Sequence, residues 1–440
     1  MFSRKDLVKL MVPLIIEQIL SVLVGMVNVV MVAKVGEAAV SGVALVESIN
    51  ILIIQLLSAM ATGGAIVAAQ FIGRKDKERA CIAANQLVLS TVVVTILITI
   101  IALAGNSVIL RVVFGQIEKS VMDSAKIYFY LSALSYPFLA VYNACAALYR
   151  AMGNSKVSMK TSLGMNVISI AGNTICIYIL HMGVEGVAIP TLVARIFAGL
   201  FMLYIIRNPK NDIHVDKSLR LGYHPEMIKN ILRIGIPNGL ENSMFQFGKL
   251  MVQSLVSTLG TAATASFAIA SNLATIEYLP GNALGLGLIT VVGQCVGAGE
   301  YGQAKKYIKK IVAVTYGIVA VVAVAMAVFA PQIVQIYNLN ADSSAIAVKL
   351  MIVHSICMIV WPLSFTLTHG LRAATDVKFP MVVSVFSMWA FRIGFSYLLV
   401  LQFNMGVMGV WIAMFIDWFF RAILFTLRFL SGKWMNQSHI

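Results

Sequence analysis

The chain contains 440 residues, of which 60% are hydrophobic and only 12% are charged. Because a soluble domain carries about 25% charged residues, this composition excludes a soluble globular protein. The net charge of +15 comes from basic clusters that lie between long apolar segments. Such placement is a signal of membrane topology and argues against nucleic acid as a partner.

Twelve apolar segments of the chain, each about 20 residues or longer, are predicted to cross a bilayer as helices. In chain order they cover 9–33, 44–72, 84–105, 124–148, 159–180, 184–206, 230–258, 266–297, 308–330, 346–369, 380–402 and 407–429. Lysine and arginine collect before the first span and after the even-numbered spans from two to ten. By the positive-inside rule, both termini and these loops are expected in the cytoplasm.

The chain is internally duplicated. The segment from Pro13 to Ala80 recurs 224 residues later, so that Pro13 matches Pro237 and Glu17 matches Glu241. Each repeat holds an even number of spans, so the two halves are expected to enter the membrane in the same direction. A shared proline and glutamate at the same depth of two apolar helices predict a substrate site between two equivalent halves of a secondary transporter.

The predicted fold class is an all-α membrane protein with twelve transmembrane helices in two pseudo-symmetric six-helix bundles. The predicted domains are an N-terminal bundle at 1–207, a cytoplasmic linker at 208–229 and a C-terminal bundle at 230–440. The linker is assigned because it is the only long polar segment of the chain.

Polar residues inside the spans are the candidates for function, because an ionised group in hydrocarbon costs at least about 2.5–3.5 kcal/mol. In span one, Glu17 and Asn28 share a helix face, and span two carries Glu47. For any single residue, structural pairing between helices is an equally good reading. Several polar residues on one face instead favour a wet cavity.

Span seven carries the strongest polar stripe, and Glu241 flanks it. Lys249 is expected to offset the negative charge of Glu241 or to form an ion pair with Glu277 of span eight. The candidate ion-coupling or substrate-binding residues are Glu17, Asn28, Glu47, Glu241, Gln246, Lys249, Gln253 and Glu277. His354 and His369 are interpreted as packing or interface residues.

No enzyme motif, nucleotide-binding loop or metal-ligand spacing is present in the sequence, so an enzyme, ATP coupling and a bound cofactor or metal are not expected. The coupling ion is expected to be Na⁺ or H⁺, with a possible Na⁺ site near Glu241. A carboxyl in a half-dry cavity exchanges protons near neutral pH.

Two further features resemble a known family. The loop phrase VAKVGEAAVSGVAL (32–45) and the repeated pair LYRAMGNSKVSM (148–159) and GLRAATDVKFPM (370–381), in which Arg150 matches Arg372, are similar to the multidrug and toxic compound extrusion (MATE) family. The resemblance covers nearly the whole chain. It implies two bundles forming a V, and export of organic, often cationic, compounds in exchange for Na⁺ or H⁺.

The resemblance transfers unevenly to single residues. Many members carry an aspartate where this chain has Asn28, and a neutral amide cannot titrate. Glu241 lies near the acidic position of span seven, and Asp376 matches a loop phrase that shapes the exit of span ten. The residues assigned to motif or structural roles are Pro13, Pro237, Arg150, Arg372 and Asp376.

The expected function is therefore a monomeric efflux antiporter for small organic, cationic drugs or toxins in a prokaryotic cytoplasmic membrane. The alternative within the same superfamily is a flippase or exporter of lipid-linked precursors. A transporter of lipid-linked precursors is expected to have a cavity rich in Arg and Lys. Lys249 is the only clear cation on the polar stripes of this sequence. A degenerate member that no longer couples ions is also compatible with Asn28. Coupling was assigned mainly to the second half, at Glu241 and Lys249.

Overall fold

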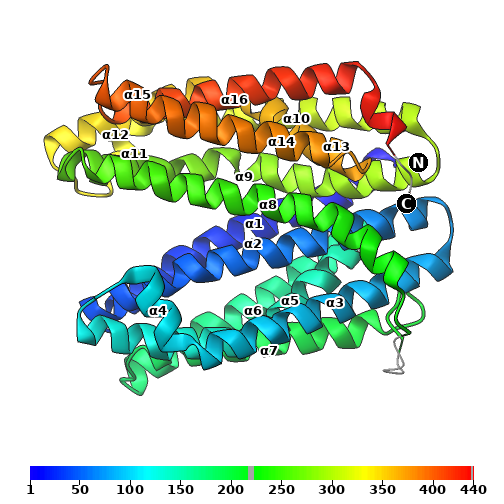
Figure 1. The fold of residues 1–440 in the computed structure, drawn as a ribbon, viewed down its shortest axis with the longest axis horizontal. Helices are drawn as coiled ribbons and strands as arrows, with labels where there is room; N and C mark the ends of the chain where they lie inside the picture. The colour runs from blue at the N-terminus through cyan, green and yellow to red at the C-terminus, as the bar shows by residue number, and fades with distance from the viewer. Residues whose placement is uncertain (217–221, 438–439) are drawn as a thin grey trace. The chain divides into compact units, whose positions relative to one another are not determined.

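The computed structural model describes residues 1–216, 222–437 and 440, and all regular structure in these ranges is helical (Figure 1). The chain divides into two compact units, Phe2–Gly239 and Leu240–Ile440 with Met1. The boundary between these two units, as defined by contacts between residues, lies inside helix α8, Pro225–Ser257. The division into domains at 1–207, 208–229 and 230–440 stays a prediction.

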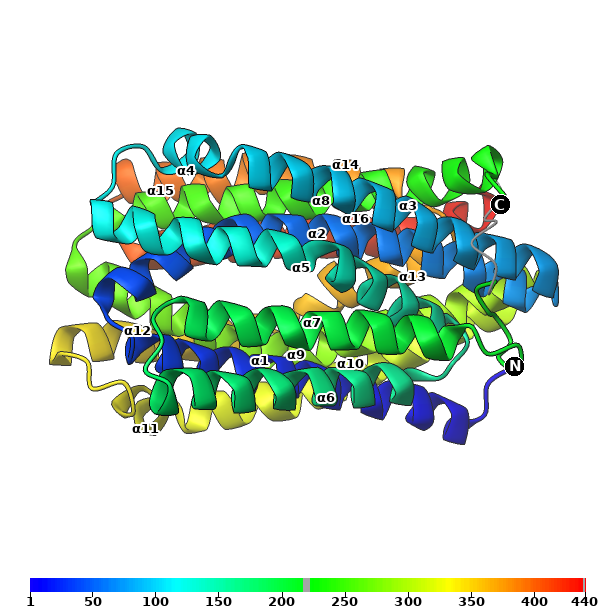
Figure 2. The same ribbon diagram turned by 90° about the horizontal axis from the view of Figure 1, so that it is seen from below.

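The first unit is built around α5, which packs on α2, α3 and α7. Helix α6 packs on α1 and α7, and Figure 2 shows α6 and α7 running side by side. The elements are α1 Arg4–Ala33, α2 Glu37–Gly73, α3 Lys77–Ala104, α4 Asn106–Phe114, α5 Lys119–Ala151, α6 Ser155–Thr174, the π-helix η1 Ile175–Ile179 and α7 Glu185–Ile206. The first residues of α8 also belong to this unit.

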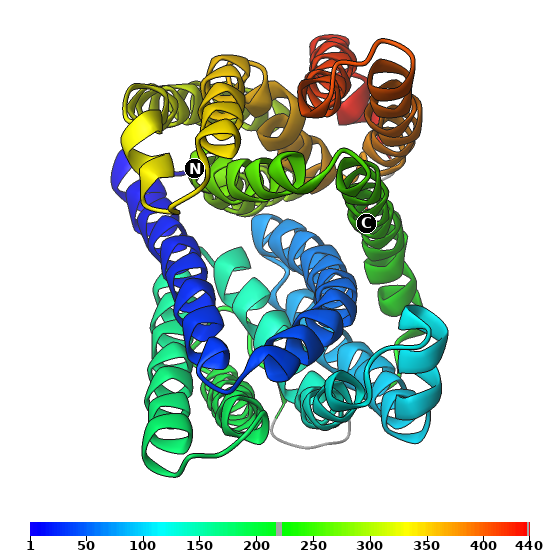
Figure 3. The ribbon, with the colours of Figure 1, turned by 90° about the vertical axis from the view of Figure 1, so that its left-hand side faces the viewer.

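The second unit is built around α9, which packs on α10, α12 and α13. Helix α16 packs along the span formed by α14, η3 and α15, as the nearly end-on view of Figure 3 shows. The elements after α8 are α9 Thr261–Gly297, α10 Tyr301–Val328, α11 Ala330–Gln335, α12 Ala341–Cys357, η2 Pro362–Thr366, α13 Leu367–Ala373, α14 Lys378–Ser387, η3 Met388–Gly394, α15 Phe395–Leu401, α16 Val407–Leu430 and η4 Lys433–Asn436.

The duplication seen in the sequence is preserved in the helix boundaries. Helices α2 and α9 are both 37 residues long, and α3 and α10 are both 28 residues long. Both pairs begin and end at the offset of 224 residues that relates the two repeats. Each unit therefore repeats the same order of spans, as predicted.

Ten helices in the described ranges are long and apolar enough to cross a membrane, and one bent pair adds an eleventh span. Helix α8 is not among them, although its 33 residues are more than long enough. Its polar stripe lowers its mean hydropathy. Counting α8 gives twelve spans in the described part of the chain, which is the predicted number.

The tenth span, predicted over 346–369, is broken. Helix α12 ends at Cys357, and the segment Pro362–Ala373 continues at an angle of 62°. Proline lacks a backbone N–H and its ring clashes with the carbonyl of the residue four positions earlier, here Met358, which explains a break at this point. Pro137, near the matching place in the first repeat, stays inside the unbroken helix α5.

Close backbone contact fixes α7 against α5. A Cβ atom built on Gly199 of α7 would lie 2.6 Å from the carbonyl oxygen of Phe138 in α5. Backbone cannot rotate away as a side chain can, so only glycine permits this approach. The contact holds the bundle that surrounds the polar residues of the first unit.

We expect Gly199→Ala to destabilise the folded protein by about 1–3 kcal/mol, because the added methyl group overpacks the contact. Thermal unfolding of the purified protein in detergent measures the effect as a lower Tm. Gly317→Ala is the matched control, since nothing lies within 4 Å of its added Cβ. Equal Tm values for the two variants would contradict the assigned contact.

Candidate functional site

Glu17 of α1 is a buried carboxylate that is held by hydroxyl groups. Its side chain accepts hydrogen bonds from Tyr142 Oη at 3.2 Å and from Ser158 Oγ at 2.7 Å. The residue is 9% exposed, and it forms no ion pair with any residue in the described ranges. Three helices, α1, α5 and α6, thus place oxygen atoms around one carboxylate.

Asn28 lies on the same helix as Glu17 but contacts an amide. Asn173 of α6 donates from Nδ2 to Asn28 Oδ1 at 3.1 Å. Asn173 is fully buried, and its own Oδ1 accepts no hydrogen bond within the described structure. Glu17 and Asn28, which were predicted to share one helix face, therefore each contact α6 at a different residue.

Glu47 of α2 belongs to a network with α5. Tyr128 Oη donates to Glu47 Oε1 at 2.7 Å, and Asn50 Nδ2 donates to the same oxygen at 2.9 Å. Tyr136 Oη in turn donates to Asn50 Oδ1 at 2.6 Å. Like Glu17, Glu47 receives neutral donors only and forms no ion pair with the described residues.

Glu241 of α8 is ion-paired, unlike its repeat partner Glu17. Arg372 of α13 donates from Nη2 to Glu241 Oε2 at 2.6 Å, and both side chains are 10% exposed. Lys249 is therefore not the partner of Glu241, which corrects the prediction. The error arose because Arg372 is 131 residues from Glu241, and its position in the repeated loop motif suggested a structural role alone.

Glu277 of α9 is held by α12. His354 Nδ1 lies 2.7 Å from Glu277 Oε2, and Ser355 Oγ donates to Oε1 at 2.7 Å. Glu277 and His354 are each 1% exposed, and the ring of His354 packs against Trp411 and Trp418. The alternative pairing of Lys249 with Glu277 is wrong. His354 packs against aromatic rings as predicted, but it also contacts Glu277, which was not predicted. A histidine side chain with an acid partner on a neighbouring helix has no local sequence signal.

The remaining stripe residues of α8 are less buried. Gln246 is half-buried, whereas Lys249 and Gln253 are exposed. Lys249 Nζ lies 5.8 Å from the centroid of the Phe245 ring and forms no ion pair with the described residues. The stripe therefore carries an uncompensated positive charge.

Asp376 fixes the loop after α13 to α16. Arg428 donates from Nε to Asp376 Oδ2 at 2.8 Å and from Nη2 to Oδ1 at 3.2 Å. This two-point ion pair is a strong structural contact, in keeping with a role at the exit of span ten. Pro13 and Pro237 lie inside α1 and α8, which continue through them. Arg150 lies in the last turn of α5.

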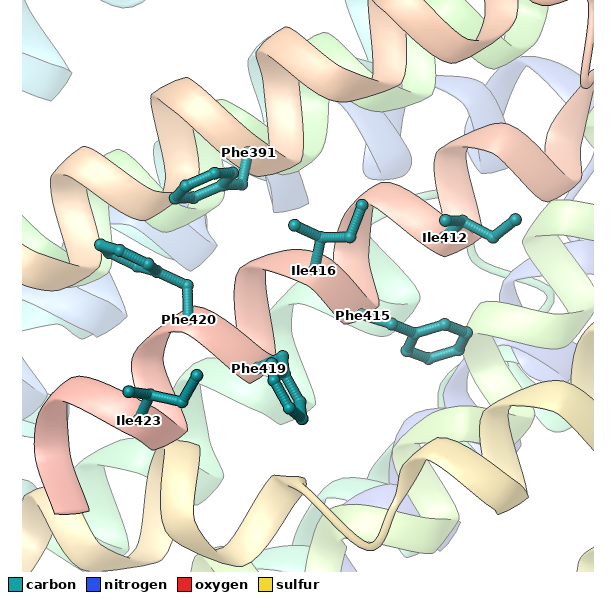
Figure 4. A pocket seen from close by; sticks show the side chains of 7 residues that line it. All are labelled: Phe391, Ile412, Phe415, Ile416, Phe419, Phe420 and Ile423. Atoms are coloured by element: carbon teal, nitrogen blue, oxygen red, sulfur yellow. The ribbon is translucent and has the colours of Figure 1, made fainter.

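An open pocket on the second unit is entirely apolar. Figure 4 shows the side chains that line it, which come from η3 and α16. They are Phe391, Ile412, Phe415, Ile416, Phe419, Phe420 and Ile423. With no titratable or hydrogen-bonding side chain among them, this pocket does not serve ion coupling. Among the described residues, no group of three or more His, Cys, Asp or Glu side chains could hold a metal ion.

We expect Glu241→Gln to destabilise the protein by about 3–5 kcal/mol, because it leaves the buried Arg372 guanidinium without its counter-charge. The double variant Glu241→Gln/Arg372→Met should recover most of that loss, since no unpaired charge then remains. Chemical or thermal unfolding in detergent compares the four proteins of the double-mutant cycle. A double variant less stable than Glu241→Gln would contradict this account of the pair.

Comparison with known proteins gives one consistent result. The sequence profile of the MatE family matches residues 13–175 and again 237–398, once in each repeat. The chain is 26% identical over 431 residues to the uncharacterized transporter YisQ of Bacillus subtilis (strain 168), covering 97% of this chain and 94% of YisQ. It is 26% identical over 447 residues to the probable multidrug resistance protein NorM of Thermotoga maritima, covering 99% of this chain and 94% of NorM.

The fold agrees with this result. A crystal structure described as MATE in complex with MaL6 superposes with a TM-score of 0.91 at 21% identity, covering 98% of this chain and 97% of the other. The two matches of the family profile together span well over half of the chain. The chain therefore belongs to the MatE family, which is the multidrug and toxic compound extrusion family that its sequence resembles.

Proposed function

We propose that this protein is a secondary active efflux antiporter that exports small organic compounds in exchange for H⁺ or Na⁺. Its membership of the MatE family and its likeness to a probable multidrug resistance protein support drug or toxin efflux by a transporter rather than an enzyme. The multi-span helical fold and bacterial relatives support the cytoplasmic membrane of a prokaryote as its location. Cytoplasmic termini and a monomeric state complete the proposal.

The observation that carries this proposal is the environment of Glu17. A buried carboxylate without a cationic partner is costly unless a proton or a metal cation neutralises it. Tyr142 and Ser158 supply hydroxyl oxygens around it, and hard cations such as Na⁺ prefer oxygen ligands. Glu17 is therefore our primary site for the coupling ion, and Glu47, which is also held only by neutral donors, is the second.

The second half is less suited to this task than the sequence suggested. Arg372 already neutralises Glu241, so Na⁺ at Glu241 would have to displace a guanidinium at 2.6 Å. Lys249 adds a further positive charge to the same helix. We therefore place coupling in the first unit. Glu241 is retained as a residue that stabilises the second unit.

The charge of the exported compound is a question separate from the site of ion coupling. A cationic compound is implied by resemblance to the family, and among the described residues the acids best suited to a cation are those of the first unit, Glu17 and Glu47. The alternative, export of lipid-linked precursors, requires a cavity rich in Arg and Lys, and Lys249 is the cation that the sequence places on the polar stripes. In the structure, Arg392 and Arg421 join Lys249 near one aromatic ring of the second unit.

We expect Glu17→Gln to abolish gradient-driven efflux while the protein stays folded, because a neutral amide cannot bind or release the coupling ion. The measurement is dye export from proteoliposomes under separately imposed sodium and pH gradients. Glu37→Gln, which removes an exposed acid from α2, should leave the rates of dye export under the sodium gradient and under the pH gradient unchanged. Undiminished export by Glu17→Gln would remove Glu17 from the mechanism.

We expect Asn28→Asp to change the ion dependence of transport. The substitution introduces a titratable group into α1, the helix of Glu17, and places it beside the Asn173 amide of α6. Transport in proteoliposomes is measured across a pH series with and without sodium. The variant should show a new dependence on pH or sodium, and Asn28→Gln should not. An unchanged profile would show that this position is peripheral to coupling.

A further inference from the structure

Three positively charged side chains meet at one aromatic ring of the second unit. The Phe245 ring centroid lies 5.8 Å from Lys249 Nζ, 5.0 Å from Arg392 Cζ and 6.0 Å from Arg421 Cζ. These residues come from three membrane spans, one that contains α8 and two consecutive later ones that contain η3 and α16. We call Lys249, Arg392 and Arg421 the cationic cluster.

A single acid compensates this cluster. Asp417 Oδ1 accepts from Arg421 Nε at 2.8 Å and also from the hydroxyl of Ser387. Asp417 Oδ2 lies 3.8 Å from Arg392 Nη1 and accepts no hydrogen bond within the described structure. No other acid in the described ranges is ion-paired with the cluster. Three positive charges therefore face one negative charge.

Two other arginines of this unit, one buried and one partly buried, are balanced one to one. Arg372 pairs with Glu241, and Arg428 pairs with Asp376. The excess charge is thus confined to the cationic cluster and is not a general property of the unit. Each uncompensated charge within a membrane span costs at least about 2.5–3.5 kcal/mol, which points to a functional reason for keeping it.

Arg392 is ion-paired with Asp417 at 3.8 Å, but its hydrogen-bond donors are unused. Its side chain is only 12% exposed, and its guanidinium donates no hydrogen bond to any described residue. A guanidinium has five N–H donors in a planar fork that matches a carboxylate or phosphate. Arg392 also lies in η3, an interior π-helix, and such segments occur frequently at functional sites.

Aromatic rings extend from the cluster. Phe245 contacts Phe365 edge-on at a centroid distance of 6.5 Å, Phe365 stacks on Trp361 at 5.1 Å, and Trp361 stacks on Tyr278 at 5.7 Å. On α8, the amides of Gln246 and Gln253 accompany Lys249 on its polar face. Positive charge, amide donors and aromatic surface together suit a molecule with an acidic group and an apolar body.

We propose that the cationic cluster binds the acidic group of an amphipathic organic anion, and that such anions are a substrate class of this transporter. The acidic group is a carboxylate, sulfonate or phosphate, carried by a soluble compound or by a lipid. Arg421 stays with Asp417 as a structural pair, while Arg392 and Lys249 contact the ligand. The proposal rests on the proposed efflux function for its transport part, but binding does not require ion coupling.

The test uses fluorescein and ethidium, two aromatic dyes of opposite charge. Binding to the purified protein in an uncharged detergent is measured by fluorescence polarization. We expect fluorescein to bind more tightly than ethidium, and Lys249→Gln or Arg392→Gln to weaken fluorescein binding about tenfold or more, as expected for loss of a charged contact. Lys309→Gln, which removes an exposed charge from α10, is the matched control and should bind normally.

Charge reversal sharpens the test. Lys249→Glu should abolish fluorescein binding and improve ethidium binding, and because Lys249 is exposed and unpaired, folding should be preserved. Equal fluorescein binding by the wild type, Lys249→Gln and Lys249→Glu proteins would overturn the site, as would tighter binding of ethidium by the wild type. If Arg392→Gln fails to fold, the Lys249 variants decide the result.

Competition identifies the source of the acidic group. Displacement of fluorescein by phosphatidic acid but not by inorganic phosphate assigns the site to a lipid headgroup, and displacement only by soluble aromatic carboxylates or sulfonates assigns it to drug-like anions. Either result supports the anion site. Export of ethidium without any fluorescein binding would refute the site alone. Cluster-dependent fluorescein binding without gradient-driven export of either dye would refute the antiport function alone.

Discussion

The cost of placing charge inside a membrane governs the arrangement of this protein. The buried and partly buried acids Glu17, Glu47 and Glu241 receive donors from neighbouring helices or from their own, and those donors differ from site to site. Glu17 and Glu47 receive hydroxyl and amide groups, whereas Glu241 receives a guanidinium. The kind of donor decides what each acid is free to do, because a neutral environment leaves room for a coupling ion and an ion pair does not.

The duplication supplies two similar frames with different chemistry. Glu17 and Glu241 occupy equivalent positions at the start of each repeat, and α2 and α9 share the same length and register. The partners have diverged, so the first unit retains acids without counter-charges and the second accumulates cations around Phe245. The proposed antiport of an inward cation and an outward organic compound would use these two chemically different halves.

Prediction from the sequence succeeded where the signal is local. Span number, span position and the repeat follow from runs of apolar residues and from identities at a constant offset. The break in span ten had a local signal, Pro362, but the same residue type at Pro137 leaves α5 intact. A proline alone does not decide between a kink and a continuous helix, because neighbouring helices determine whether the freed carbonyl is satisfied.

The sequence by itself determined that the chain is a duplicated helical membrane protein of this family. Hydropathy and the identities between the two repeats can be read from the sequence without knowing which residues are in contact. Only the tertiary structure decided which charges meet. Arg372 reaches Glu241 and His354 reaches Glu277 across separations of 131 and 77 residues. Pairing depends on which helix faces are turned toward each other. The pattern of polar and apolar residues along one helix shows which face is polar, but it does not show which other helix that face contacts.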